Sequence, residues 1–283
     1  MNIERQRLQD IGWKRWGPYV SNREWGNVRE DYSPDGDAWN YTNHAMAESK
    51  TYRWGEEGIG GICDSSQLLC FAVGMWNYKD PIVKERFFGL TNQQGNHGED
   101  VKELYYYLDS TPTHSYMKML YKYPQQPFPY QWLINENANR SKQLPEVELI
   151  DTGIFDNNEY FDVFIEYAKA DKDDILIKIT VCNRAAQKAS LKLLPTLWFR
   201  NTWSWGSDIY KPKMKAANRH IEIEHKNLKL THCHISQSAP ALFCDNETNT
   251  RVLYQVSSSN PFYKDGINDF VIRGNEDAVN SLQ

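Results

Sequence analysis

The 283-residue sequence lacks the features that mark a membrane, secreted or nucleic-acid-binding protein. No apolar run approaches the roughly 18 to 20 residues that a membrane span needs. The polar start from Met1 to Asp10 does not resemble a secretory signal. The formal net charge is -5, and acidic and basic residues are interspersed, so no basic stripe is present to neutralise a phosphate backbone. These absences predict a cytoplasmic protein with neither a membrane nor a nucleic acid as its partner.

Several common signatures of chemistry are also missing. The five cysteines are scattered without CxxC spacing, which argues against a disulfide framework or a zinc knuckle and predicts reduced, mostly buried thiols. The GxSxG, HExxH, P-loop and GxGxxG patterns are absent, and with them the usual signals for nucleophilic, zinc-dependent and phosphoryl-transfer chemistry and for dinucleotide binding. No cofactor is therefore expected.

Aromatic residues are abundant: they make up 13% of the chain and include 10 Trp and 17 Tyr. Six tryptophans precede residue 80, namely Trp13, Trp16, Trp25, Trp39, Trp54 and Trp76. Large flat rings bury much area in a core, and they are also surfaces on which sugar rings stack. Core packing is the favoured interpretation for any single tryptophan, because this residue type is highly buried on average.

The apolar pattern predicts a mainly β fold. Helices are expected over 4–12, 37–53 and 132–144, and a turn-rich loop precedes the second of them. Alternating or continuous apolar residues predict strands over 69–76, 103–122 (two strands around a turn at 110–113), 161–181 (a hairpin), 191–200, 220–230, 231–236, 241–244 and 251–256. Phe161, Val163 and Ile165 should face one core. This series predicts an antiparallel β-sandwich over 71–283, preceded by a mixed loop and helix segment over 1–70.

Two Gly-rich irregular segments combine aromatic, acidic and histidine side chains, the types that stack on a sugar and bind its hydroxyls. They supply the candidate substrate-binding residues Trp54, Glu56, His97, Glu99 and Asp100. Trp54 would stack on a sugar face, while Glu56 and Glu99 would accept hydroxyl hydrogen bonds. The alternative is structural: Trp54 plugs an edge of the sandwich, and the carboxylates pair with Arg53 and Lys102.

Two groups of histidines were weighed as metal ligands. His97 lies beside Glu99 and Asp100, but this spacing matches no standard metal site. Four more histidines, His220, His225, His232 and His234, lie in expected strands, where His232 and His234 share a face. Satisfied or solvated histidines are the favoured interpretation of that pair, and no metal is expected.

Nine longer runs carry a family resemblance: Trp16–Tyr19, Trp25–Ser33, Gly36–Tyr41, Tyr52–Gly58, Phe88–Asn92, Gly95–Lys102, Tyr107–Tyr116, Leu194–Gly206 and Lys264–Asp269. In these runs the sequence resembles a bacterial branch of glycoside hydrolase family 63, which includes mannosyl-oligosaccharide glucosidase. The resemblance implies a β-sandwich of the super-sandwich type that precedes an (α/α)6 barrel. It also implies inverting hydrolysis by two carboxyl groups, both in the barrel, held roughly 6.5 to 9.5 Å apart so that a water fits between base and sugar.

The chain departs from that family by showing strands, after Tyr160, where a barrel would need long helices. No residue is therefore assigned as acid or base. The resemblance implies the amino-terminal portion of an α-glucosidase-like enzyme acting on oligosaccharides or glucosides, whose partner is the barrel of the same protein. Two alternatives stay open: a free-standing carbohydrate-binding module, and a metal-dependent hydrolase built on His97, Glu99 and Asp100.

Overall fold

The structure is a computed structural model that describes residues 2–19, 42–52, 58–91, 93–96, 100–206, 209–237, 239–258 and 260–280. The chain divides into two compact units. Unit one comprises Met1–Ala45 and Trp54–Trp198, and unit two comprises Met46–Arg53 and Phe199–Gln283. The boundary expected near residue 70 and the barrel expected outside this chain stay predictions.

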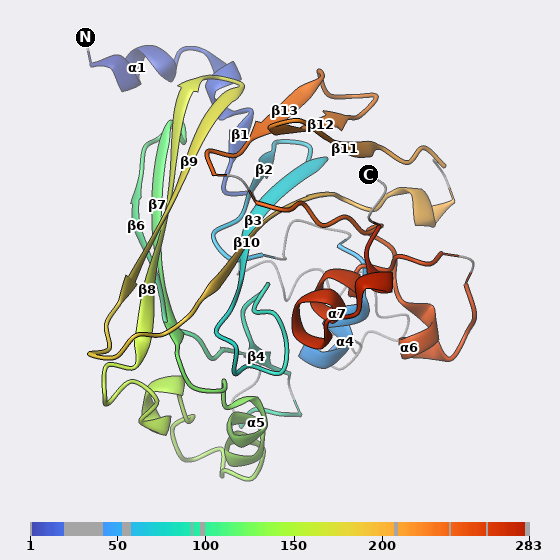
Figure 1. The fold of residues 1–283 in the computed structure, drawn as a ribbon. Coiled ribbons are helices and arrows are strands. Elements are labelled where there is room, and N and C mark those ends of the chain that lie inside the picture. The colour runs from blue at the N-terminus through green and yellow to red at the C-terminus, as the bar shows by residue number, and fades with distance from the viewer. Residues whose placement is uncertain are drawn as a thin grey trace. The chain divides into compact units, whose positions relative to one another are not determined.

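Two four-stranded sheets and one short ribbon organise unit one (Figure 1). The first sheet has the order β1 (Trp16–Gly17), β2 (Ile62–Asp64), β3 (Leu69–Trp76) and β10 (Lys192–Phe199). The second has the order β6 (Tyr105–Ser110), β7 (Tyr116–Pro124), β8 (Tyr160–Asp171) and β9 (Asp174–Asn183). The ribbon pairs β4 (Gly89–Leu90) with β5 (Asp100–Val101). A mainly β chain with antiparallel pairing is confirmed, including the hairpin expected over 161–181.

One apolar cluster draws its buried side chains from both four-stranded sheets. Val73 and Met75 of β3 belong to it together with Met119 of β7 and Val163 and Ile165 of β8. Every second residue of β8 points into this cluster, because successive side chains of a strand face opposite sides. The alternation in the sequence therefore predicted the inward face of β8 correctly.

A glycine allows the backbone to approach β8 closely. Gly60 has a φ of +61°, and a Cβ there would lie 2.6 Å from the Cδ1 of Ile165. The Gly60 carbonyl also accepts a hydrogen bond from the Tyr167 hydroxyl at 2.5 Å. Only a residue without a side chain fits this contact.

Helices are short in the described ranges. Unit one has α1 (Ile3–Arg7) and α5 (Tyr130–Ala138) with 3-10 turns η1 (Ile11–Lys14) and η2 (Leu149–Thr152), and α4 (His44–Ser49) continues from it into unit two. Helices were expected near all three α-helices, although the first part of the 37–53 segment lies outside the described residues. No described helix is both long and apolar enough to cross a membrane.

Unit two contains a three-stranded antiparallel sheet in the order β11 (Lys213–Ala217), β12 (His220–Glu224) and β13 (Thr231–His234). Its helical elements are α6 (Thr250–Tyr254), α7 (Gly266–Arg273), η3 (Trp203–Trp205) and η4 (Glu276–Ala278). The strands expected from residues 220 and 231 are present, whereas β11 and α7 were not expected.

Two expected strands of unit two are wrong. Residues 251–254 belong to α6, because the Asn249 side chain accepts from the Val252 N–H and caps the helix, and Gln255 follows as its C-cap with a φ of 57°. Residues 241–244 have irregular backbone, where the Phe243 carbonyl accepts from the Asn280 N–H at 2.7 Å. Local apolar content predicted strands in both places, but capping and a distant chain segment determined the backbone.

We expect Ile165→Ala to destabilise the chain by about 2 to 5 kcal/mol, because it opens a cavity among fully buried neighbours. Leu176→Ala on the neighbouring β9 is the matched control: it removes the same number of carbons from a side chain that is 62% exposed, and should change stability by less than about 0.5 kcal/mol. Urea unfolding measures both. Equal losses would mean that β8 does not face the core.

A buried lysine ties the amino-terminal segment to the second sheet. The Nζ of Lys169 donates to the carbonyls of Trp13 at 2.6 Å, Trp16 at 2.5 Å and Thr113 at 3.3 Å. Burial lowers the pKa of Lys169 to about 8, while the carboxylates of Glu4 and Asp173 act in the opposite direction. The folded chain therefore releases this proton more readily than the unfolded chain does.

This pKa shift predicts a rise in stability with pH. Below pH 8 both states hold the proton and the full cost of burying the charge is present. Between pH 8 and about 10.4 only the unfolded state holds it, so the free energy of unfolding increases. Relative to Lys169→Met, the unmodified chain should gain about 2 kcal/mol between pH 7.5 and pH 10 in urea unfolding. A flat or falling difference would contradict this assignment.

Candidate functional site

The sequence-predicted binding residues fall largely outside the described part of the chain. Trp54, Glu56, His97 and Glu99 all lie outside it. Asp100 lies on β5, where its backbone pairs with Leu90 of β4. The structure thus describes the base of the segment that carries His97 and Glu99, and it leaves the binding roles of these five residues as predictions.

A buried carboxylate fixes the base of this segment. Glu103, two residues after β5, and Lys84 both have side chains that are 0% exposed. The Oε1 of Glu103 accepts from the Lys84 Nζ at 2.8 Å and from the Phe88 N–H at 2.9 Å. Its Oε2 accepts from the Tyr121 hydroxyl of β7 at 2.9 Å. One side chain therefore joins both sides of the β4–β5 ribbon to the core sheet.

A second buried lysine holds the same ribbon from the other direction. The Lys102 N–H donates to the Phe88 carbonyl at 2.9 Å. Its Nζ donates to Glu146 at 2.6 Å and to Glu148 at 2.8 Å, and the Lys102 side chain is 0% exposed. The ribbon is thereby connected to the chain that leads into η2. The alternative interpretation, in which the candidate carboxylates pair with Arg53 and Lys102, stays a prediction, because Arg53, Glu56 and Glu99 lie outside the described residues.

The buried Lys84–Glu103 ion pair fixes the geometry at the base of this segment more than it adds to the free energy of unfolding. Burial raises the pKa of Glu103, even though the Lys84 ammonium and three hydrogen bonds favour its ionised form. The Lys84 Nζ also lies 3.6 Å from the ring centroid of Phe128 and 4.6 Å from that of Tyr130. A buried ion pair contributes little net free energy, but separating its partners is costly. The segment between β4 and β5 consequently begins and ends at rigid points.

We expect Lys84→Met to destabilise the chain by about 3 to 5 kcal/mol, because it leaves the Glu103 carboxyl buried without its cation. The double variant Lys84→Met/Glu103→Gln should recover most of that loss, because it leaves no unpaired charge and the Gln amide oxygen can still accept from the Phe88 N–H. Lys118→Met is the control: its ammonium lies 3.8 Å from Glu166 in a partly exposed pair, which contributes less than about 1 kcal/mol. Urea unfolding tests the series, and strictly additive losses in the double variant would refute the coupling.

Unit two contains an anchor of a different kind. The Asn246 Oδ1 accepts from the Tyr52 N–H and the Thr51 hydroxyl, both at 2.7 Å. Its Nδ2 donates to the carbonyls of Tyr52 at 2.7 Å and Phe199 at 2.8 Å, and its own carbonyl accepts from the Asn201 Nδ2 at 2.7 Å. One asparagine thus joins the starts of two aromatic segments, 52–58 and 198–206. Sequence reasoning missed it, because a lone Asn forms no pattern with partners so distant in the chain.

The second of these aromatic segments presents an oriented tryptophan. The Trp203 Nε1 donates to the Glu247 Oε1 at 2.7 Å, and the Lys211 Nζ reaches the same oxygen at 2.5 Å. The Lys211 ammonium lies 6.0 Å from the Trp203 ring centroid. Trp203 is partly exposed. A flat ring held beside a carboxylate and an ammonium offers stacking and hydrogen bonding, the two contacts that a sugar needs.

Another resembling run, 264–269, has a structural explanation inside unit two. The Asp265 carboxylate accepts from the Ser49 hydroxyl at 2.6 Å and from the Asn249 Nδ2 at 2.9 Å. The Lys264 Nζ donates to the Glu48 carbonyl at 3.0 Å at the end of α4. A Cβ on Gly266 would lie 2.2 Å from the carbonyl oxygen of Ala278. These contacts therefore hold helical elements of unit two together.

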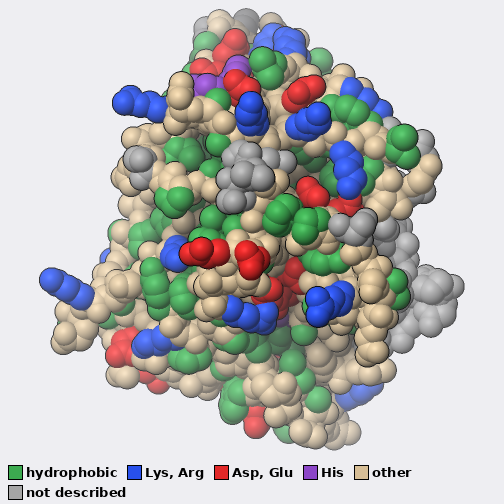
Figure 2. Space-filling view, turned by 45° about the vertical axis from the view of Figure 1, so that its right-hand side comes forward, with side chains coloured by type: hydrophobic (Ala, Val, Ile, Leu, Met, Phe, Trp, Pro, Cys, Tyr) green, Lys and Arg blue, Asp and Glu red, His purple; other side chains and the backbone are tan. Residues whose placement is uncertain are grey.

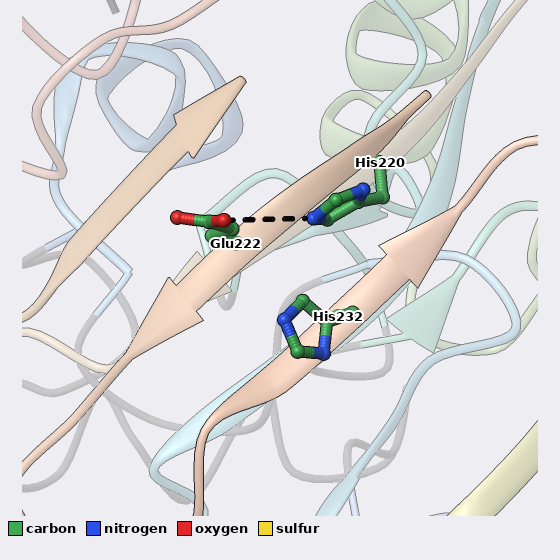
Figure 3. Close-up of side chains that lie close together, drawn as sticks. All are labelled: His220, Glu222 and His232. Atoms are coloured by element: carbon green, nitrogen blue, oxygen red, sulfur yellow. Dashed lines mark ion pairs between the residues drawn. The ribbon is translucent and has the colours of Figure 1, made fainter. Parts of the chain in front are cut away.

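The β11–β13 sheet gathers histidines on one face. His220 pairs with His234 and Glu222 pairs with His232 across the β12–β13 ladder, so all four side chains share a face. The expectation that His232 and His234 share a face is confirmed, and the register adds His220 and Glu222 to them. The His220 Nε2 lies 3.6 Å from the Glu222 Oε1 (Figure 3). Two imidazoles and one carboxylate are donors that transition-metal ions accept.

Comparisons with known proteins give one match to a curated protein. Over 324 aligned positions the chain is 41% identical to an uncharacterized protein of Saccharomyces cerevisiae, and the match covers 98% of this chain. The chain spans 29% of the length of that yeast protein. No protein-family description matches the chain. No solved structure matches it either.

Proposed function

We propose that this chain is the amino-terminal portion of an inverting, α-glucosidase-like glycoside hydrolase of the family 63 type, acting on oligosaccharides or glucosides. Its two four-stranded sheets would form the β-sandwich of that architecture. Its loops would supply substrate contacts to an (α/α)6 barrel of the same protein, and the catalytic acid and base would lie in that barrel. Trp54, Glu56, His97, Glu99 and Asp100 would form the substrate-facing surface.

The observation that carries this proposal is the anchoring of the aromatic and polar segments on which the resemblance rests. The side-chain amide of Asn246 hydrogen-bonds to the backbone of Tyr52 in one segment and to that of Phe199 in another. Glu103 holds both sides of the β4–β5 ribbon through buried contacts that contribute more to position than to stability. Binding residues act best on rigid supports, because ordering a loose segment costs affinity.

The yeast relative supports the barrel part of the proposal. Its match to this chain occupies 29% of its length, which leaves most of the yeast protein for other domains. A catalytic barrel beside a supporting β portion fits that division. A free-standing binding module, the competing function, has no need for such a remainder.

We expect this chain, purified alone, to hydrolyse aryl α-glucosides and gluco-oligosaccharides no faster than a buffer blank, because inversion needs two carboxyl groups in fixed geometry. The full-length yeast relative, assayed in parallel, should release glucose with inverted anomeric configuration, which proton NMR detects at early times. Turnover by the isolated chain, abolished by a substitution within it, would contradict the proposed location of the active site. Tight glycan binding by the chain with no hydrolysis by the full-length protein would favour the module.

Substitutions in the full-length enzyme proposed to contain this chain test the binding surface. Trp54→Ala and Glu99→Gln should each lower kcat/KM at least about tenfold while the melting temperature stays unchanged. The matched controls are Trp132→Ala and Glu136→Gln, both at exposed positions on α5. Controls should keep normal kcat/KM. A large drop in melting temperature with normal turnover in the surviving folded protein would instead make Trp54 and Glu99 structural.

A further inference from the structure

The three-stranded sheet of unit two has faces of opposite character. Ile221, Ile223 and Cys233 alternate with the polar residues, and Ile223 is buried at 2% exposure. The opposite face carries His220 and Glu222 from β12 and His232 from β13. Figure 2 shows histidine side chains beside acidic ones at the surface, so donors of both kinds are reachable from solvent. This sheet face is independent of the residues proposed above for glycan binding.

The three donors converge from two neighbouring strands. One ligand atom from each of His220, Glu222 and His232 lies within 4.8 Å of the others. In Figure 3 the His220 ring and the Glu222 carboxylate extend from the same strand, and His232 extends from the neighbouring one. Two ligands of a tetrahedral zinc ion lie about 3.3 Å apart when each bond is about 2.05 Å. The 3.6 Å between His220 and Glu222 already approaches this value. His220 is partly exposed and Glu222 and His232 are exposed, so binding an ion requires these side chains to rotate toward one another without repacking a core.

The imidazole rings of this face lie next to one another. The ring centroid of His220 lies 5.0 Å from that of His232 and 5.2 Å from that of His234. A divalent transition-metal ion can bond to imidazole nitrogens and to a carboxylate oxygen together. Lys215 on β11 is the register partner of Glu222, so its ammonium competes with a metal ion for the Glu222 carboxylate. The metal ion has the advantage that the two imidazoles also bond to it, whereas they do not bond to an ammonium in this way.

We propose that His220, Glu222 and His232 bind one divalent transition-metal ion, of which Zn²⁺ is the best fit, with water in the fourth position. Imidazole and carboxylate donors suit zinc and its neighbours better than Ca²⁺ or Mg²⁺, which prefer oxygen ligands alone. The ion bonds to both β12 and β13 and so cross-links the hairpin. Because the ion binds the folded sheet, it stabilises that sheet by RT ln(1 + c/Kd), which rises with the free ion concentration c.

Cobalt is the probe, because Co²⁺ occupies zinc-type sites and its visible absorption reports tetrahedral nitrogen and oxygen coordination. The 283-residue chain, prepared without a polyhistidine tag and dialysed against EDTA, is titrated with Co²⁺ and the bound ion is then displaced with Zn²⁺. We expect one ion per chain. His220→Ala, Glu222→Gln and His232→Ala should each weaken binding at least about tenfold, since even outer-shell losses cost 10- to 100-fold.

His234→Ala is the matched control, because it removes an imidazole from the same face outside the triad, and it should bind Co²⁺ with unchanged affinity. Circular dichroism in EDTA checks that each variant folds. If a histidine variant does not fold, Glu222→Gln still tests the site, because it is an isosteric change at a half-exposed side chain. A rise in the melting temperature with Zn²⁺, reversed by EDTA, is expected only for the unmodified chain and the control. Lack of Co²⁺ binding by the unmodified chain, or equal losses in His234→Ala, would overturn the assignment.

Discussion

The register between β7 and β8 is the constraint on which unit one depends. It runs from Tyr116 opposite Ala168 to Pro124 opposite Tyr160. This pairing directs Tyr121 of β7 and Val163 and Ile165 of β8 into one cluster. A slip by one residue would turn every one of these side chains to the opposite face. The register also positions the polar end of the core, because the hydroxyl of inward-facing Tyr121 reaches the carboxylate of Glu103.

The buried charged residues of unit one connect the β4–β5 ribbon to the core. Glu103 and Lys102 follow β5 directly, and their partners come from four other places in the chain. Removing such charges from water costs free energy that their mutual attraction largely offsets, so the net gain in stability is small. The effect on conformational specificity is larger, because an ion pair with several hydrogen bonds is satisfied in only one geometry. A short ribbon of two-residue strands is thereby tied to the core by buried side chains.

Polar side chains connect several segments of unit two. Asn246 bonds to segments 51–52 and 199–201, and Asp265 joins α7 to Ser49 and Asn249. Side-chain to backbone bonds of this kind are directional, so they specify a loop conformation that apolar packing would leave variable. The resembling runs consequently differ in role. The run at 264–269 holds helical elements together, whereas the run at 198–206 is anchored through Phe199 and Asn201 and contains the partly exposed Trp203.

The sequence by itself determined the mainly β character and the long hairpin, because a strand half buried against a core repeats its apolar residues with a period of two. Phe161, Val163 and Ile165 show that period and are buried. The strand predicted from the apolar residues of 251–256 is wrong, because the Asn249 side chain caps a helix there. Only the tertiary structure joined Lys84 to Glu103, Asn246 to Tyr52 and His220 to His232. The first two pairs join segments that are far apart in the chain, and the third depends on the register between β12 and β13. The local pattern of apolar residues predicts neither kind of contact.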